Sequence, residues 1–564
     1  MHKLINKLAA RLPLDFRILY RQFLLRVVDL EALSIQADVV GYLGQFAGVL
    51  IMLSLLHSLV TYIGYMTFTA PADRLAFCWH MEHYLISTTM LVIGLITVIS
   101  WDAAFPDRRD VMVLSPLPIA PHTILFAKIA AATAVLGLAI VTLNAASGVV
   151  LSLLLGVQPG PAWGFVQSFA AYWFTILAAS AFLYGSVLTL QGFTALVLPR
   201  RIFLRLSAFL QLAAFGLFLG VYFAQPLLTD PISMADSRNQ WILASSPSYW
   251  FFALFNQLNG SWPAEFSWLA SRAWIALGIA VAGAASSLLL CYIHAMKKTV
   301  EEPDLVPGAG GLHCMPSFGS SLQTAVTLFS IRSLTRSRQH RVAFAFYMAF
   351  VLGLALSLLR GELATPAPAP VSMDLLISTF LMMFFAVAGL RNVFALPISL
   401  TANWVLRTTQ LRTSENYIAA TRRTLLLLAV APVWLLSFAL SLRFRPITQV
   451  AIHLAALALL GCILAELCLV GFYKVPFTCS YLPGKANIQL IFWGFIIVMI
   501  AFVFPAAEFE LSALTVPLKA AFMLSALGAL FWALWIFNRH RAKSAVIYFE
   551  EIPDQIITTL GLSA

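Results

Sequence analysis

The chain contains few side chains whose types and spacing could perform chemistry. One group of acidic, basic and imidazole side chains occurs where the first external loop is expected, at the start of the second long apolar run. Such a set could bind a metal ion or form an acid–base pair, although a solvated loop is the favoured interpretation. The group consists of Asp73, Arg74, His80, Glu82 and His83.

Two further ionisable side chains lie within the apolar run near 449–473. Glu466 lies inside this run, and His453 lies near its outer end. Ionisable residues at membrane depth are rare and are functional candidates by default. Glu466 therefore has two interpretations: a role in transport or gating, or a structural carboxylate that is paired or protonated.

The sequence has no motif for nucleotide binding or for common hydrolytic chemistry. The loop at 474–485 fails as a phosphate-binding loop, because Cys479 stands where Gly is needed and Ala486 where Ser or Thr is needed. No hydrophilic segment is long enough to form a soluble catalytic domain. The 6 cysteines form no CxxC pair and no short Cys/His cluster. We therefore expect no catalytic residue, no metal site and no cofactor bound by this chain.

The composition is that of a membrane protein with many spans. The chain has 564 residues, of which 61% are hydrophobic and 10% charged, and its mean hydropathy is +0.88. A helix needs about 20 apolar residues to cross the hydrocarbon core, and about twelve stretches approach or reach that length. The predicted fold is an all-α polytopic membrane protein. The predicted spans lie near 39–66, 84–103, 122–157, 163–198, 204–228, 268–296, 342–359, 374–391, 424–442, 449–473, 487–505 and 513–537.

The distribution of Lys and Arg predicts the orientation. With both termini in the cytosol, almost all basic residues fall in cytosolic segments. Much of the net charge of +11 is then a topology signal that also favours contact with anionic lipid, and no nucleic-acid partner is indicated. Residues 1–38 are basic and amphipathic, which predicts a helix lying in the cytosolic interface. Its apolar face consists of Phe16, Leu19, Tyr20, Phe23 and Val27.

A cytosolic tripeptide occurs twice between apolar runs. Leu117-Pro118-Ile119 is followed by Lys128, and Leu396-Pro397-Ile398 is followed at the same distance by Arg407. Pro lacks an N–H and biases its predecessor away from the helical conformation. We therefore expect each copy to be a short helix or turn before the next long helix, and we interpret it as a docking element between two spans.

The segment that precedes each pair of spans is repeated as well. The segments 16–21 and 331–336 share the spacing x-Arg-x-Leu-x-Arg, and each stands just before a span. Each half then has the same order: interfacial basic helix, span, outer loop, span, Leu-Pro-Ile stretch and four more spans. An even number of spans in each half makes the repeat parallel. The repeated basic residues are Arg17, Arg21, Arg332 and Arg336.

The two halves are separated by a stretch rich in Gly and Pro. We predict a first six-span half at 1–296, a cytosolic linker at 297–325, a second six-span half at 326–538 and a cytosolic tail at 539–564. In the first half, the aromatic segment 229–267 predicts short helices at the outer membrane surface. The matching segment of the second half, 506–512, is too short for the same feature.

These motifs and their order resemble the membrane subunits of type-2 ABC exporters. The resemblance is carried by the basic segment 16–26, the stretch FPDRRDVMVLSPLPIAPHTILFAK at 105–128 and its echo ALPISLTANWVLR at 395–407. It covers both halves, and it rests on short motifs together with the order of the elements. It implies that each half has six spans, an interfacial elbow helix and a cytosolic coupling helix, and that one chain resembles two fused half-permeases.

The resemblance also implies a function and a partner. The chain would be a passive permease that couples a separate nucleotide-binding ATPase, acting as a dimer, to movement of a substrate. ATP and Mg²⁺ would be bound by that partner, and the protein would lie in the bilayer of a bacterial inner membrane. The residues expected to contact the ATPase are Asp107, Arg108, Arg109, Asp110, Leu117, Pro118, Ile119, Leu396, Pro397, Ile398, Arg407, Arg412 and Glu415.

Two other classes of protein stay open. An ion-coupled secondary transporter would use intramembrane charges, for which Glu466 and His453 are the candidates, although an inverted repeat would favour that class more. A polytopic membrane enzyme, such as a lipid-linked glycosyltransferase, would need acidic residues on a substantial outer loop. Asp73 and Glu82 are the candidates for that role.

The first prediction concerns topology. Reporter fusions at Ala564 and near Pro307 should both report a cytosolic location, because basic residues concentrate in the segments around them. The measurement is the activity of a reporter that works only in the cytosol, with labelling by an impermeant reagent as the control. External labelling at either site would contradict the predicted orientation.

Overall fold

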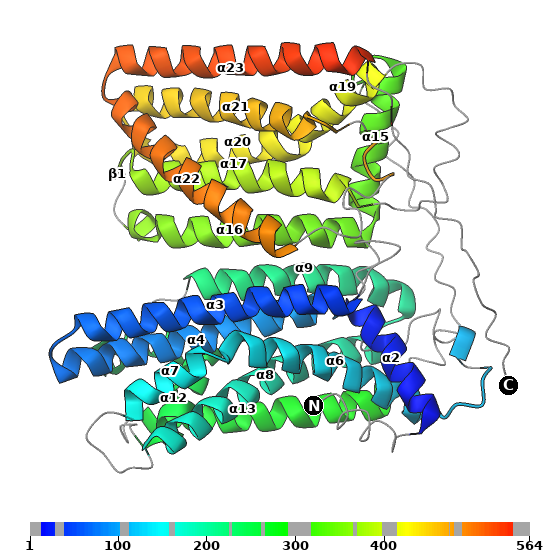
Figure 1. Ribbon diagram of the computed structural model, residues 1–564, viewed down its shortest axis with the longest axis vertical. Coiled ribbons are helices and arrows are strands. Elements are labelled where there is room, and N and C mark those ends of the chain that lie inside the picture. The colour runs from blue at the N-terminus through cyan, green and yellow to red at the C-terminus, as the bar shows by residue number, and fades with distance from the viewer. Residues whose placement is uncertain are drawn as a thin grey trace. The chain divides into compact units, whose positions relative to one another are not determined.

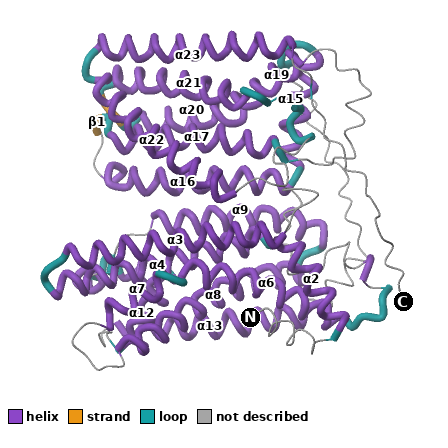
Figure 2. Tube along the Cα trace, viewed as in Figure 1, coloured by secondary structure: helices purple, strands orange, loops and turns teal. Residues whose placement is uncertain are grey.

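The computed structural model describes most of the chain, and nearly all of what it describes is helical (Figure 2). The described residues form parts of two compact units, and each unit is treated separately below. The described residues are 13–28, 39–101, 112–114, 116–156, 164–224, 228–229, 231–260, 266–291, 317–364, 369–396, 414–472, 474–478, 488–544 and 547.

Within its described residues, the first unit contains a basic N-terminal helix, long apolar helices and four short helices. In Figure 1 the helix α2 lies at one end of this unit, and the turn between α3 and α4 lies at the other. The helices are α2 (Leu14–Val28), α3 (Val39–Thr67), α4 (Pro71–Ile99), α6 (Pro121–Asn144), α7 (Ser147–Gly156), α8 (Gly164–Val197), α9 (Arg200–Ala224), α10 (Pro231–Ala235), α11 (Gln240–Ser245), α12 (Pro247–Asn259) and α13 (Ser267–Ser286), which continues into the π-helical turn η3 (Ser287–Cys291).

The second unit has a similar order of elements. Its helix α15 lies across one end of the long helices, and the short strand β1 lies at the opposite end (Figure 1). The elements are α15 (Ser321–Arg336), α16 (Arg338–Ala364), β1 (Ala369–Pro370), α17 (Met373–Phe394), α19 (Ser414–Leu425), the π-helical η5 (Leu426–Val430), α20 (Ala431–Ser441), β2 (Phe444–Arg445), α21 (Ile447–Leu469), α22 (Ile488–Leu514) and α23 (Pro517–Ser544). The two strands pair in parallel, with Ala369 opposite Phe444.

Local sequence signals explain where several helices begin and end. Pro71, Pro121 and Pro247 are each the first residue of a helix, a position whose N–H has no partner within the helix. At the start of α15, Ser320 and Gln323 form a reciprocal capping box. Helix α12 ends at Gly260, whose φ of 76° lies in the left-handed region that glycine adopts without strain.

Ten helices of the described chain are long and apolar enough to cross a membrane. This finding supports the predicted all-α polytopic class. Helix α9 contributes a shorter apolar stretch, Phe209–Phe223, and α22 is also helical where a span is predicted. The predicted number of about twelve spans therefore remains a prediction.

Two predicted external loops are helical. Helix α4 begins at Pro71, so the charged group at 73–83 lies on the helix, with Glu82 and His83 each only 1% exposed. Helix α22 continues through 506–512 to Leu514, where an external connection is predicted. In both places charged residues lower the local hydropathy, but Glu82, His83 and Glu510 are buried against other helices of the same unit, whereas Asp73 and Glu508 are exposed.

The aromatic segment of the first unit forms the expected short helices, but its side chains are placed differently. Four aromatic side chains of α12, namely Tyr249, Phe251, Phe252 and Phe255, are at most 1% exposed. They belong to the core that α12 shares with α4, α8 and α13. Aromatic residues also fill protein cores, and these four side chains do so here. The position of the short helices at the outer membrane surface stays a prediction.

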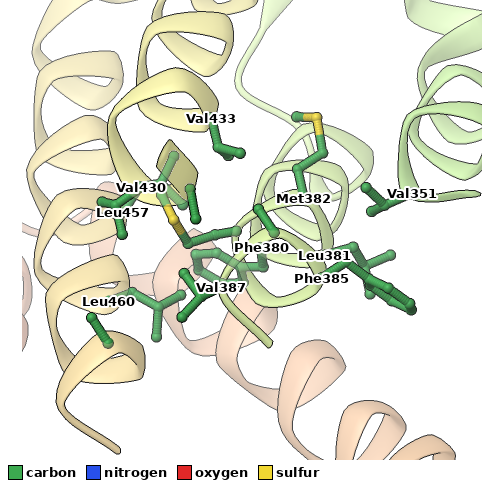
Figure 3. Packing of buried hydrophobic residues seen from close by; sticks show 14 of the residues in the cluster. Val351, Phe380, Leu381, Met382, Phe385, Val387, Val430, Val433, Leu457 and Leu460 are labelled. Atoms are coloured by element: carbon green, nitrogen blue, oxygen red, sulfur yellow. The ribbon is translucent and has the colours of Figure 1, made fainter. Parts of the chain in front are cut away.

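Each unit has its own apolar core. In the second unit, Phe380 and Val387 of α17 lie between α16 and α21, and Val430 of η5 and Leu457 of α21 face them (Figure 3). The polar residues discussed below are set into this packing.

Helices α8 and α13 approach each other closely in the first unit. A Cβ atom added at Gly185 would lie 2.9 Å from the backbone oxygen of Ala280. A Cβ added at Gly137 of α6 would meet nothing within 4 Å. Small residues allow close contact of membrane helices, so Gly185 sets the distance between α8 and α13.

The second prediction compares these two glycines. Gly185→Ala should destabilise the protein by about 1–3 kcal/mol, because a backbone carbonyl must shift. Gly137→Ala should leave stability unchanged or raise it by about 0.5–1 kcal/mol, since Ala is the better helix former. Thermal unfolding of both variants in the same detergent provides the comparison, and equal effects would show that the close approach is not important.

Candidate functional site

The first Leu-Pro-Ile stretch is a turn before α6, as predicted. The N–H of Leu117 donates to the carbonyl of Leu114, and the N–H of Ile119 donates to the carbonyl of Leu117 at 2.7 Å. Leu117 and Pro118 are exposed, whereas Ile119 packs on a small core formed by α2 and α6. The stretch thus presents two residues outward and is anchored by the third.

The second Leu-Pro-Ile stretch begins at the end of α17. Leu396 is half-buried, and its carbonyl lies 2.9 Å from Nε2 of His340, which stands in the first turn of α16. Glu415 begins α19 and lies 3.6 Å from Arg539 at an exposed position. The other predicted contact residues lie outside the described residues, and they are Asp107, Arg108, Arg109, Asp110, Pro397, Ile398, Arg407 and Arg412.

The two elbow helices are amphipathic, as predicted. In α2, Leu19 and Phe23 are buried against α6. The ammonium of Lys128, itself only 4% exposed, lies 5.2 Å from the centre of the Phe23 ring. In α15, Val326 packs against Tyr417 of α19. The four elbow arginines are exposed, and they are Arg17, Arg21, Arg332 and Arg336.

Glu466 is the acceptor of a polar network that joins three helices. Arg422 of α19 bonds both carboxylate oxygens of Glu466, with Nη2 at 3.1 Å from Oε2. Asn538 of α23 donates from Nδ2 to Oε2 of Glu466 and to the backbone carbonyl of Glu466, both at 2.8 Å. Glu466 is only 1% exposed. The geometry therefore favours the paired structural carboxylate among the two interpretations drawn from the sequence.

A second cation lies one turn from this network. The Nε of Arg391 in α17 donates to the backbone carbonyl of Cys468 in α21 at 2.9 Å, and the guanidinium carbon lies 4.2 Å from the centre of the Phe472 ring. Glu466, Asn538 and Arg391 all stand near the C-terminal ends of their helices. At this end of the second unit, hydrogen bonds that involve charged side chains thus hold the helices together.

His453 takes part in a different cluster toward the other ends of these helices. Its Nε2 lies 3.1 Å from Oγ1 of Thr379 in α17, and its Nδ1 lies 2.9 Å from Oε1 of Glu510 in α22. The order hydroxyl, imidazole, carboxylate is that of a hydrolytic triad. However, Thr379 is fully buried and its hydroxyl also bonds the carbonyl of Leu375, so a substrate carbonyl has no access to it.

In the first unit, the buried polar side chains of α4 form hydrogen bonds with neutral partners. Nδ2 of Asn256 in α12 donates to Oε2 of Glu82 at 2.8 Å, while Oε1 of Glu82 is buried without a partner. His83 lies 3.1 Å from the hydroxyl of Ser248 and stacks on Tyr249. Among the described residues, no group of three or more His, Cys, Asp or Glu could hold a metal ion. The solvated-loop interpretation of this group is therefore wrong for Glu82 and His83.

Sequence reasoning missed Glu510, Asn538 and Asn256 as functional or structural partners. Glu510 was assigned to a short external connection, although an acidic residue flanked by long apolar runs is itself a signal of an intramembrane site. Asn538 and Asn256 carry no such signal, since neutral amides are common in helices near membrane surfaces. Their roles follow only from the helices that they face.

No family model, no curated protein and no solved structure matches the chain in the comparisons with known proteins.

The third prediction concerns the Arg422–Glu466 pair. Glu466→Leu should destabilise the protein by about 3–5 kcal/mol, because it leaves the largely buried guanidinium of Arg422 without its partner. The double variant Arg422→Met, Glu466→Leu should recover part of this loss. Thermal unfolding in detergent measures both.

The matched control is Glu415→Gln, which breaks an exposed pair with Arg539 and should cost less than about 1 kcal/mol. Similar losses for Glu415→Gln and Glu466→Leu would contradict a special role for the buried network.

Proposed function

We propose that this chain is the membrane-spanning permease of an ATP-driven exporter of the ABC type. In this proposal the chain itself performs no chemistry. A separate ATPase dimer binds ATP and Mg²⁺, and its closure moves the permease halves so that a substrate crosses the membrane. The protein would lie in a bacterial inner membrane with both termini in the cytosol.

One observation carries this proposal more than any other. Both Leu-Pro-Ile stretches come after the second long helix of their unit and before the next one, and each is joined to the region of the elbow helix. Ile119 packs with Leu19 and Phe23 of α2, and Leu396 is bonded to His340 at the junction of α15 and α16. A partner that grips these stretches would therefore act on both the elbow and the spans.

The contacts within the two units support the proposed parallel repeat. The elbow α2 packs on α6, and the elbow α15 packs on α19. Likewise α4 packs on α8 and α8 on α13, while α17 packs on α21 and α21 on α23. If α9 and α22 also cross the membrane, each unit has six spans in the same order. We infer two fused half-permeases from this correspondence.

In the second unit, contacts near Leu396 join the cytosolic Leu-Pro-Ile stretch to the ends of several long helices, so that a displacement of the stretch would displace these helices. The N–H of Phe477 donates to the carbonyl of Phe394 at 2.8 Å, and the Phe477 ring contacts both Phe394 and His340. Arg391 links the same end of α17 to the end of α21. The ends of α16, α17 and α21 would therefore move together with Leu396.

The two alternatives are affected differently by the structure. A membrane enzyme that uses acidic residues on an outer loop loses one of its two candidates, because Glu82 is buried within α4. An ion-coupled transporter gains a candidate site, because His453 is paired with Glu510 inside the second unit.

The fourth prediction tests the ATPase contact. Reversing Arg108 and Arg109 to Glu, together with Leu117→Asp, should weaken assembly with the cognate ATPase by about 2–5 kcal/mol if these groups are buried at the contact. Co-purification and the stimulation of ATP hydrolysis by the permease measure the effect. Arg238→Glu, at an exposed position beside α11 in the aromatic segment, is the matched control and should assemble normally.

Normal assembly and normal stimulation in the triple variant would show that 104–120 is an ordinary loop. The coupling assignment would then be wrong. ATP binding by the purified chain alone would contradict the proposed division of labour between permease and ATPase.

A further inference from the structure

Three side chains from three helices of the second unit meet away from the Arg422–Glu466 network. Thr379 and His453 are fully buried, and Glu510 is 2% exposed. Each stands four to six residues from an end of its helix, the starts of α17 and α21 and the end of α22. At 1.5 Å per residue, this places the cluster roughly 6–9 Å inside those ends.

The hydrogen atoms of this cluster can be arranged in two consistent ways. In the first, the hydroxyl of Thr379 donates to the carbonyls of Leu375 and Leu376, both at 3.0 Å. Nε2 of His453 must then carry a hydrogen and donate to Oγ1 of Thr379. Nδ1 faces a carboxyl oxygen of Glu510 at 2.9 Å, so a proton must lie between them. In this arrangement the cluster has no net charge.

In the second arrangement, the hydroxyl of Thr379 turns and donates to Nε2 of His453. Nδ1 of His453 then carries the only ring hydrogen and donates to an ionised Glu510. This arrangement has one proton fewer and one net negative charge. The two states differ by one proton and by the rotation of one hydroxyl, so the cluster can exchange a proton without moving a heavy atom.

The surroundings favour the state that holds the proton. Among the described residues, the ion-pair partner of Glu510 is His453 itself. An uncompensated carboxylate in such a buried site is costly, whereas the protonated cluster is neutral. Most charged groups near this end of the unit are exposed, and they are Asp374 of α17, Arg445 of β2, Glu508 of α22, Lys519 of α23 and Arg360 of α16. Two more, Glu362 of α16 and Arg443 just before β2, are half-buried. The elements η5 and α20 carry no charged residue, and Arg422 of α19 is bound to Glu466.

The helix that carries Glu510 has a point of weakness next to the cluster. Pro505 lies inside α22, five residues before Glu510. Proline removes one hydrogen bond from the helix and disturbs the preceding turn, which makes this position a natural hinge. A bend at Pro505 would carry Glu510 away from His453, admit water and allow the carboxyl group to release its proton.

We propose that Thr379, His453 and Glu510 form an intramembrane proton-binding site that holds one proton when the end of α22 is closed on α21 and releases it when that end moves away. The proton comes from water at the nearer membrane surface and returns to water. This inference does not depend on the ATPase partner, so it stands or falls separately from the proposed function.

The test measures proton uptake by the full chain in lipid nanodiscs. A pH indicator gives the number of protons bound per chain across a titration, and infrared difference spectra report protonation of carboxyl groups. Glu510→Gln should bind one proton fewer and lose a carboxyl signal, because the amide donates permanently to Nδ1 of His453. Glu508→Gln, at an exposed position on the same helix, is the matched control and should leave this titration step unchanged.

A second variant separates a shared proton from two independent groups. His453→Gln should keep one bound proton, now on Glu510 alone, with its titration step moved to another pH. The double variant His453→Gln, Glu510→Gln should lose one proton, as Glu510→Gln does. If Glu510→Gln does not fold, the double variant answers the same question by the same measurement. An unchanged proton count in Glu510→Gln, or the loss of two protons in the double variant, would overturn the proposal.

Discussion

Polar side chains inside a membrane protein must satisfy one another, because the hydrocarbon around the helices offers no hydrogen-bond partner. In the second unit this constraint ties α19, α21 and α23 together through Arg422, Glu466 and Asn538. Each bond joins residues far apart in the chain, so it fixes which helices are neighbours and at what height. Apolar packing alone would allow helices to slide, since one lipid-like surface replaces another at little cost.

The second unit is held differently at its two ends. At one end, the hydrogen bond from Arg391 and the aromatic contacts of Phe477 join the ends of α16, α17 and α21 into a block. At the other end, the His453 cluster faces a part of α22 that follows Pro505. If α22 bends at Pro505 as proposed, a displacement of the block at one end would be transmitted along the bundle to the other end. This is the mechanical property that a permease driven from one side requires.

The two units satisfy their buried polar side chains with different kinds of partner. In the first unit, Glu82 is bonded to the amide of Asn256, and Asn144 accepts hydrogen bonds from Thr89 and Tyr172. In the second unit, the buried carboxylates Glu466 and Glu510 face an arginine and a histidine. Similar order of elements therefore does not make the halves equivalent. Among the described residues, the buried His–Glu pair belongs to the second unit.

The sequence by itself determined the class of the protein, the approximate positions of most long helices, the amphipathic elbows and the turn at Leu117-Pro118-Ile119. These features depend on local hydropathy, helical periodicity and the missing N–H of proline, all of which are read within one segment. Only the tertiary structure placed Glu82 inside α4 and Glu510 beside His453. The reason is that a charged side chain is read as exposed unless its partner is known, and these partners are distant, with 174 positions between Glu82 and Asn256 and 57 between His453 and Glu510. Local composition carries no information about such a partner, and the packing of the helices supplies it.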